Sequence, residues 1–219
     1  MIEIYALKTD GLPNVETLIS HVCLQIGDRR AKWRKMPQAR AKESIGAMLL
    51  LQYALGRMGI SPHTCTVATD ETGRPYLMGV NPCVDFNVTH TDGLAVCAIA
   101  TGENARVGVD AEALGMRHAE SLERVAARWF TPRELDRLKA AADREREFLL
   151  IWTAKEATVK RTGEGLSALA RTDSVPNIDA DYELAHYSVE DATVALCYSK
   201  GELPPSEIFL LKAEDLFGY

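Results

Sequence analysis

Apolar positions in the first hundred residues switch between strand-like alternation and helical spacing. Met1 to Tyr5 alternate as in a half-buried strand, whereas the apolar residues between Val15 and Ile26 recur every three or four positions. Gly59 is a typical helix end. The predicted order is a strand at 1–5, helices at 15–26 and 45–58, and strands at 64–69, 84–90 and 94–101, with a turn at 71–75.

The second half of the chain repeats this order. A strand is predicted at 106–112, helices at 119–128, 132–141 and 144–161, and strands at 182–189, 193–198 and 207–211. The repetition predicts an α+β protein with two pseudosymmetric halves of similar topology, 1–104 and 105–219. In each half we expect helices packed on a small, mainly antiparallel sheet.

Composition narrows the class of protein. The 219 residues are 47% hydrophobic and 26% charged, with a net charge of -6, which fits a globular protein and disfavours nucleic-acid binding. No apolar run is long enough for a membrane span, and the first residues lack a secretory signal. Five scattered cysteines without C-x-x-C indicate reduced thiols. We therefore expect a cytoplasmic protein without membrane contact.

A basic segment from Arg29 to Lys42 runs against the acidic average. It holds seven Lys or Arg residues and no acid. Such a run is either a solvated helix face or a surface that binds phosphate, and the sequence leaves both readings open.

Two carboxylates, Asp110 and Glu112, point to the same face of the predicted strand because they are two residues apart. Paired carboxylate oxygens suit magnesium, which prefers oxygen ligands and often binds substrate phosphates as well. The alternative is an exposed strand end that carries two solvated acids.

The helix after Arg144 carries the second group of polar candidates. Glu156 and Lys160 are four residues apart and share one face, whereas Lys155 lies along the apolar stripe. An ordinary helical ion pair explains Glu156 and Lys160 equally well. Upstream, Thr131 to Glu134 has the pattern of a capping box, so we expect Glu134 to cap a helix.

Together, these motifs resemble those of the 4'-phosphopantetheinyl transferases. G-V-D-x-E at 108–112 and W-x-x-K-E-A-x-x-K-x-x-G-x-G-L at 152–166 carry the resemblance. It extends to the G-R-P turn at 73–75, the N-V-T-H-T strand at 87–91 and the F-T-x-x-E element at 130–134. The length is similar to that of the large, pseudodimeric, surfactin-synthetase-activating class, which implies a monomer rather than the trimer of the short class.

The resemblance implies a reaction and its participants. The 4'-phosphopantetheine arm of coenzyme A would move to a serine of an apo acyl or peptidyl carrier protein, releasing adenosine 3',5'-bisphosphate. Asp110, Glu112 and Glu156 would hold Mg²⁺, with Mn²⁺ as the alternative ion. Glu156 would accept the serine proton, directly or through a metal-bound water, and Lys155, Lys160 and His90 would contact the pyrophosphate.

The resemblance also assigns coenzyme A contacts in the first half. Arg29, Lys32 and Lys42 would approach its 3'-phosphate. The residues expected to line the rest of the cofactor site are Thr72, Gly73, Arg74, Pro75, Thr89, His90, Lys155 and Lys160.

Two positions depart from the family pattern. Thr89 replaces the usual serine but keeps its hydroxyl, and Ala111 replaces a larger apolar residue. Two other functions remain open: a magnesium-dependent phosphohydrolase acting on a nucleotide or pyrophosphate, and a binding protein without turnover.

Overall fold

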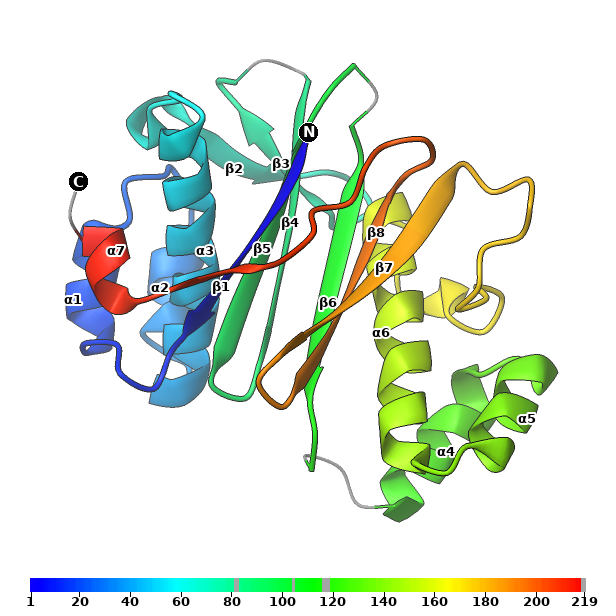
Figure 1. Cartoon of the computed structure of the whole chain (residues 1–219). Coiled ribbons are helices and arrows are strands. Elements are labelled where there is room, and N and C mark those ends of the chain that lie inside the picture. Colours follow the sequence, from blue (N-terminus) through cyan, green and yellow to red (C-terminus); the bar gives the residue numbers. More distant parts are fainter. Residues whose placement is uncertain (81–82, 104, 116–118, 218–219) are drawn as a thin grey trace.

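Two β-sheets pack face to face between two layers of helices in the computed structural model of the chain (Figure 1). The structure describes residues 1–80, 83–103, 105–115 and 119–217. It is an α+β fold, as predicted. None of the helices in these residues is long and apolar enough to cross a membrane.

The first half supplies one helical layer and most of one sheet. Its elements are β1 (Ile2–Lys8), α1 (Val15–His21), α2 (Arg29–Trp33), α3 (Gln38–Arg57), β2 (Thr66–Thr69), β3 (Pro75–Met78), β4 (Val84–Thr91) and β5 (Leu94–Thr101). Strands β4, β5 and β1 are neighbours in that order and pair antiparallel, while β2 and β3 form a separate hairpin.

The second half supplies the other sheet and the other helical layer. Its elements are β6 (Val107–Ala113), α4 (Ala119–Trp129), α5 (Pro132–Ala140), α6 (Arg144–Thr162), β7 (Tyr182–Val189), β8 (Ala192–Ser199), β9 (Phe209–Leu211) and α7 (Ala213–Phe217). Strands β6, β8 and β7 pair antiparallel in that order.

The central strands β5 and β8 are apolar throughout because both faces of each are covered. In β5, Val96 and Ala98 face the other sheet, while Cys97 and Ile99 face the α3 layer. The same alternation in β8 directs its even-numbered apolar residues to the other sheet and its odd-numbered ones to α6. Alternating side-chain direction thus gives one strand two apolar interfaces.

Most predicted elements are confirmed, and the main exceptions lie in the first half. The helix predicted at 15–26 ends at His21, and Gln25 instead forms a bridge with Thr66. Helix α3 begins at Gln38 rather than at residue 45, and α2 and β3 were not predicted. These segments are short, or polar on the exposed side, so their apolar spacing is weak or misleading.

The end of the chain crosses the predicted division into 1–104 and 105–219, which stays a prediction. Asn104, at this boundary, lies outside the described residues. Strand β9 pairs parallel with β1, so it completes the sheet of the first half. Buried Leu216 of α7 belongs to the same core as Tyr5 and Leu49. The chain after β8 therefore packs with the first half.

Candidate functional site

Helix α6 carries the motif residues Glu156 and Lys160, and both of its ends are capped. The side chain of Asp143 accepts a hydrogen bond from Arg146 N, and Gly163 ends the helix in the left-handed conformation at φ 80°. Acidic residues in the first turn and basic ones in the last complement the helix dipole. The helix thus holds both residues on a stable scaffold.

Gly108 lets β6 lie directly against α6. A Cβ atom at this position would come within 2.0 Å of Ala157 O and 2.6 Å of Arg161 N. Only glycine permits this approach of strand to helix backbone. The contact brings the carboxylates of β6 beside the polar face of α6.

Polar side chains of β4 connect the two halves by binding the backbone of β6. Alternate residues of β4 accept hydrogen bonds from alternate N–H groups of β6. The pairs are Asp85 with Val107 N at 2.8 Å, Asn87 with Val109 N at 3.0 Å, and Thr91 with Ala113 N at 3.2 Å. This β4–β6 ladder fixes the register between the halves.

Both halves line the cavity at this junction, which we call the acidic cavity and which has a volume of about 430 Å³. Its charged and imidazole side chains are Arg29, His90, Asp110, Glu112, Glu156 and Lys160. The structure therefore brings together the three predicted metal ligands, Lys160 and His90.

Lys160 is paired with Asp110 in this structure. Its Nζ lies 2.6 Å from Asp110 Oδ1 and also donates to Thr89 Oγ1 at 3.0 Å. Glu112 accepts a hydrogen bond from Trp152 Nε1 at 3.1 Å. Among the described residues, no three His, Cys, Asp or Glu side chains are grouped to hold a metal ion. The three carboxylates thus share a cavity without forming a ready metal site.

Asp110 nevertheless keeps one oxygen without a partner. Asp110 Oδ2 is buried and accepts no hydrogen bond from the described residues. An unsatisfied buried carboxylate oxygen is costly, so this atom has a strong tendency to bind a donor or a cation. The donor set of three carboxylates fits a hard cation such as Mg²⁺.

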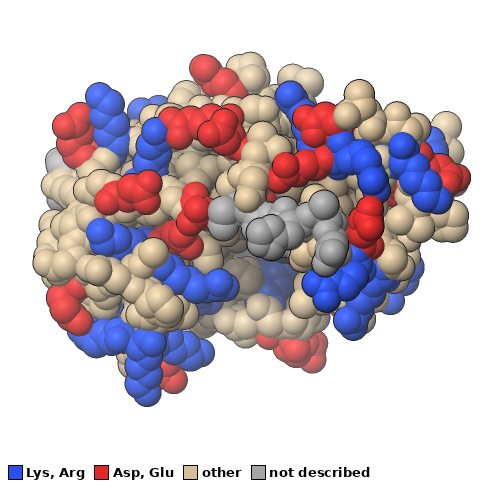
Figure 2. Space-filling view, turned by 90° about the horizontal axis from the view of Figure 1, so that it is seen from below, with Lys and Arg blue, Asp and Glu red and all other residues tan. Residues whose placement is uncertain are grey.

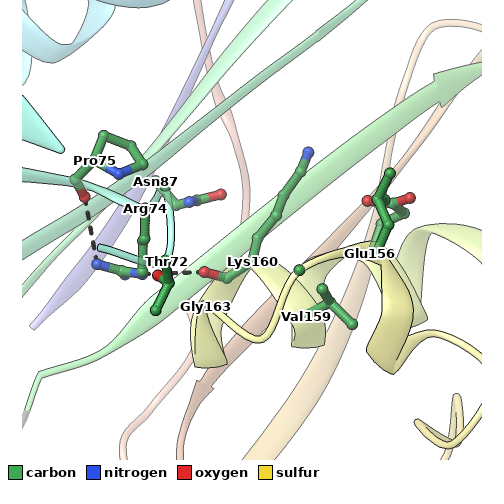
Figure 3. A pocket seen from close by; sticks show the side chains of 11 residues that line it. Thr72, Arg74, Pro75, Asn87, Glu156, Val159, Lys160 and Gly163 are labelled. Carbon is green, nitrogen blue, oxygen red and sulfur yellow. Dashed lines mark hydrogen bonds between the residues drawn. The ribbon is translucent and has the colours of Figure 1, made fainter. Parts of the chain in front are cut away.

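A second cavity of about 230 Å³, the turn cavity, shares Glu156 and Lys160 with the acidic cavity. The other predicted contacts on its wall are Thr72, Gly73, Arg74 and Pro75 (Figure 3). The guanidinium of Arg74 is buried and donates to Asp85, Lys160 O, Val107 O and Pro75 O. These bonds occupy its N–H groups, so Arg74 joins β4, β6 and α6.

A third cavity, the α2 cavity, has a volume of about 390 Å³ and contains Arg29 and Lys32. Arg29 also lines the acidic cavity, so the two cavities share this side chain. Lys42 lies on neither wall, and its ammonium donates to Leu12 O at 2.6 Å. Seen from below, the molecule carries Lys and Arg side chains beside a hollow near the centre of this face (Figure 2).

Lys155, for which a contact with pyrophosphate is predicted, lines none of these three cavities. Its side chain is completely buried, and its ammonium lies 2.7 Å from Glu134 Oε2 and also donates to Thr172 O. Glu134 closes the predicted capping box with Thr131. Burial acts to raise the pKa of Glu134, but the bonds from Lys155, Thr131 and Ser174 outweigh it and lower that pKa. Lys155 therefore fixes α6 to α5.

Sequence reasoning missed two residues of the site. Asp85 shares the alternate polar pattern of V-D-F-N-V-T-H-T with Asn87, and this pattern is a detectable signal for a polar strand face. Glu43 lies 3.3 Å from His90 Nδ1, but a single acid after a basic run gives no sequence signal.

Comparisons with known proteins agree with the motifs. The sequence model of the 4'-phosphopantetheinyl transferase superfamily matches residues 106–202. The 4'-phosphopantetheinyl transferase HetI of Nostoc is 31% identical over 144 residues, covering 64% of this chain and 59% of HetI. The Synechocystis protein slr0495, named for the same activity, is 33% identical over 171 residues, covering 75% and 66% of the two chains.

The overlap with these relatives is partial. The chain spans about half to two thirds of the length of the curated relatives it matches. A crystal structure of a holo-(acyl-carrier-protein) synthase from Bacillus anthracis, in complex with CoA (3',5'-ADP), covers 46% of this chain and 93% of its own. Its TM-score of 0.34 and 16% identity are too low to compare the folds.

Proposed function

Because this chain belongs to the 4'-phosphopantetheinyl transferase superfamily, we propose that it transfers 4'-phosphopantetheine from coenzyme A to a serine of an apo carrier protein. One observation carries the proposal. Glu156 and Lys160 of the W-x-x-K-E-A-x-x-K helix share a cavity with Asp110 and Glu112 of G-V-D-x-E. The two motifs, forty residues apart in the sequence, thus meet at one place.

The reaction is an attack on a diphosphate. The serine oxygen forms a bond to the phosphorus that bears pantetheine, the bond to the bridging oxygen breaks, and adenosine 3',5'-bisphosphate leaves with the electron pair. The serine proton must go to a base, and Glu156 is the carboxylate of α6 that faces the cavity. Lys160 would neutralise charge on the phosphate oxygens.

We propose Mg²⁺ as the ion, with Asp110, Glu112 and Glu156 as its ligands. The unsatisfied Oδ2 of Asp110 and the shared cavity support this assignment. Binding an ion requires rearrangement, because Asp110 is paired with Lys160 and Glu112 with Trp152. The ion would supply Lewis acidity toward the diphosphate.

Basic residues of the first half would hold the nucleotide end of coenzyme A. Arg29 and Lys32 in the α2 cavity are the candidates for its 3'-phosphate, and the turn from Thr72 to Pro75 for its adenine nucleotide. For Lys42, this role remains a prediction. Since both halves line the acidic cavity, one chain can supply the whole site, which supports a monomer.

The strand order supports the prediction of two related halves. Counted in chain order, the three strands of each half lie side by side in the order first, third, second. These orders are β1-β5-β4 and β6-β8-β7. A long helix, α3 or α6, covers each set. We therefore propose that the halves are structural repeats, with β9 and α7 as additions.

Intact-mass measurement of a panel of apo carrier proteins incubated with coenzyme A and Mg²⁺ tests the function. We expect the mass of phosphopantetheine to be added by the wild type and lost with Glu156→Gln and Asp110→Ala, which should keep their circular dichroism spectra. Asp136→Asn, an exposed acid on α5, is the control. Release of nucleotide without transfer to any carrier would indicate the phosphohydrolase, and binding without turnover a scaffold.

A further inference from the structure

The imidazole of His90 contacts a carboxylate that belongs to none of the sequence motifs. Glu43 of α3 places Oε2 3.3 Å from His90 Nδ1. Its other oxygen, Oε1, accepts a hydrogen bond at 3.2 Å from Gly93 N, in the turn between β4 and β5. The carboxylate is itself buried, so its position is fixed by α3 and by this turn.

The contact on Nδ1 leaves the opposite edge of the ring for the acidic cavity. His90 lines this cavity, whereas Glu43 does not. A carboxylate at Nδ1 favours the tautomer with hydrogen on that atom, because the partner of one ring nitrogen sets the state of the other. Nε2 is then the nitrogen available to a ligand.

We propose that Glu43 is a positioning residue that orients His90 and stabilises its imidazolium when an anionic phosphate group enters the acidic cavity. The inference rests on the proposed function only for the identity of that phosphate, which would belong to coenzyme A. His90 is the group that touches the ligand, and Glu43 acts through it.

The charges around His90 act in opposite directions. Burial lowers the pKa of the imidazole, Glu43 raises it, and Arg40 and Lys160 lower it. The other charged side chains of the acidic cavity are Arg29, Asp110, Glu112 and Glu156. A bound phosphate adds negative charge at Nε2, so together with Glu43 it would favour the protonated ring.

Two-dimensional NMR of the wild type tests the orientation without any substitution. Long-range ¹H–¹⁵N spectra at a pH above the His90 titration should show hydrogen on Nδ1. Hydrogen on Nε2 would overturn the inference. This readout does not depend on catalysis or on the stability of a variant.

Glu43→Gln tests the charge, because it keeps the shape and removes the carboxylate. We expect the pKa of His90 to fall and coenzyme A to bind about three- to tenfold more weakly near pH 6. The difference in affinity should shrink at pH 8, where the ring is neutral in the free protein. Glu43→Asp should recover part of the affinity, and Glu16→Gln, an exposed acid on α1, is the matched control.

The outcomes separate this inference from the proposed function. If the wild type transfers phosphopantetheine but Glu43→Gln changes neither the His90 titration nor the affinity for coenzyme A, the positioning role is wrong and the function stands. If the His90 tautomer and titration behave as expected but no carrier is modified, the pair stands and the function is wrong.

Discussion

Lys155 and Lys160 show how two lysines of one motif acquire different roles. They are five residues apart on α6 and therefore project in different directions. Lys155 points into the protein, where Glu134 and Thr172 satisfy it, and Lys160 reaches the acidic cavity. The difference lies in what surrounds each side chain.

Lys155→Met is therefore expected to affect stability. It leaves the Glu134 carboxylate buried without its cation, so the free energy of unfolding should fall by about 3 to 5 kcal/mol. Urea denaturation followed by circular dichroism measures this loss. Lys139→Met, which removes an exposed ammonium from α5, should change stability by less than about 1 kcal/mol. If the Lys155→Met protein is stable but binds coenzyme A poorly, the result would instead support the phosphate contact predicted from the sequence.

At the scale of elements, the site depends on how closely β6 approaches α6 and β4. Gly108 sets the first distance, and the β4–β6 ladder sets the register with the first half. Arg74 adds bonds to Lys160 O and Val107 O at the point where the three elements meet. The polar residues are thus placed by backbone contacts between elements.

Gly108→Ala should separate β6 from α6. The added methyl group would clash with backbone atoms, which cannot move away by changing a rotamer as a side chain can. We therefore expect a loss of about 2 kcal/mol or more in the free energy of unfolding. Thermal or urea unfolding measures it. Gly56→Ala in α3 is the matched control, because nothing lies within 4 Å of the added atom and alanine favours helix by about 0.5 to 1 kcal/mol. Equal effects of the two substitutions would contradict the proposed close approach.

At the scale of the molecule, the two halves share one interface, and the end of the second half packs with the first. The even-numbered faces of β1 and β5 pack against β6 and β8. Strand β9 extends the first sheet, and α7 packs in the first core. Neither half is therefore covered on all sides without the other.

We expect the chain to unfold in one cooperative transition. Trp33 reports on the first half, and Trp129 and Trp152 on the second. Two variants separate these signals: one keeps only Trp33, and the other lacks only Trp33. In each variant, the urea midpoint measured by fluorescence should match the midpoint measured by circular dichroism. If fluorescence and circular dichroism midpoints differ within either variant, the halves would be independent domains.

The sequence by itself determined the α+β class, nearly all strands and the motifs that identify the family. These properties depend on local periodicity and on residue types at fixed spacing, which are present in the chain before it folds. Strand β5 was predicted at 94–101, the range observed, because its apolar run is continuous.

Only the tertiary structure decided which polar groups face the acidic cavity. The sequence shows that Lys155, Lys160 and Arg74 each carry a charge that needs a partner. The partners, Glu134, Asp110 and Asp85, come from other elements. It also decided that β9 returns to β1, a pairing between residues two hundred positions apart. Such contacts depend on the packing of the whole chain, because no local pattern specifies which surface will cover another.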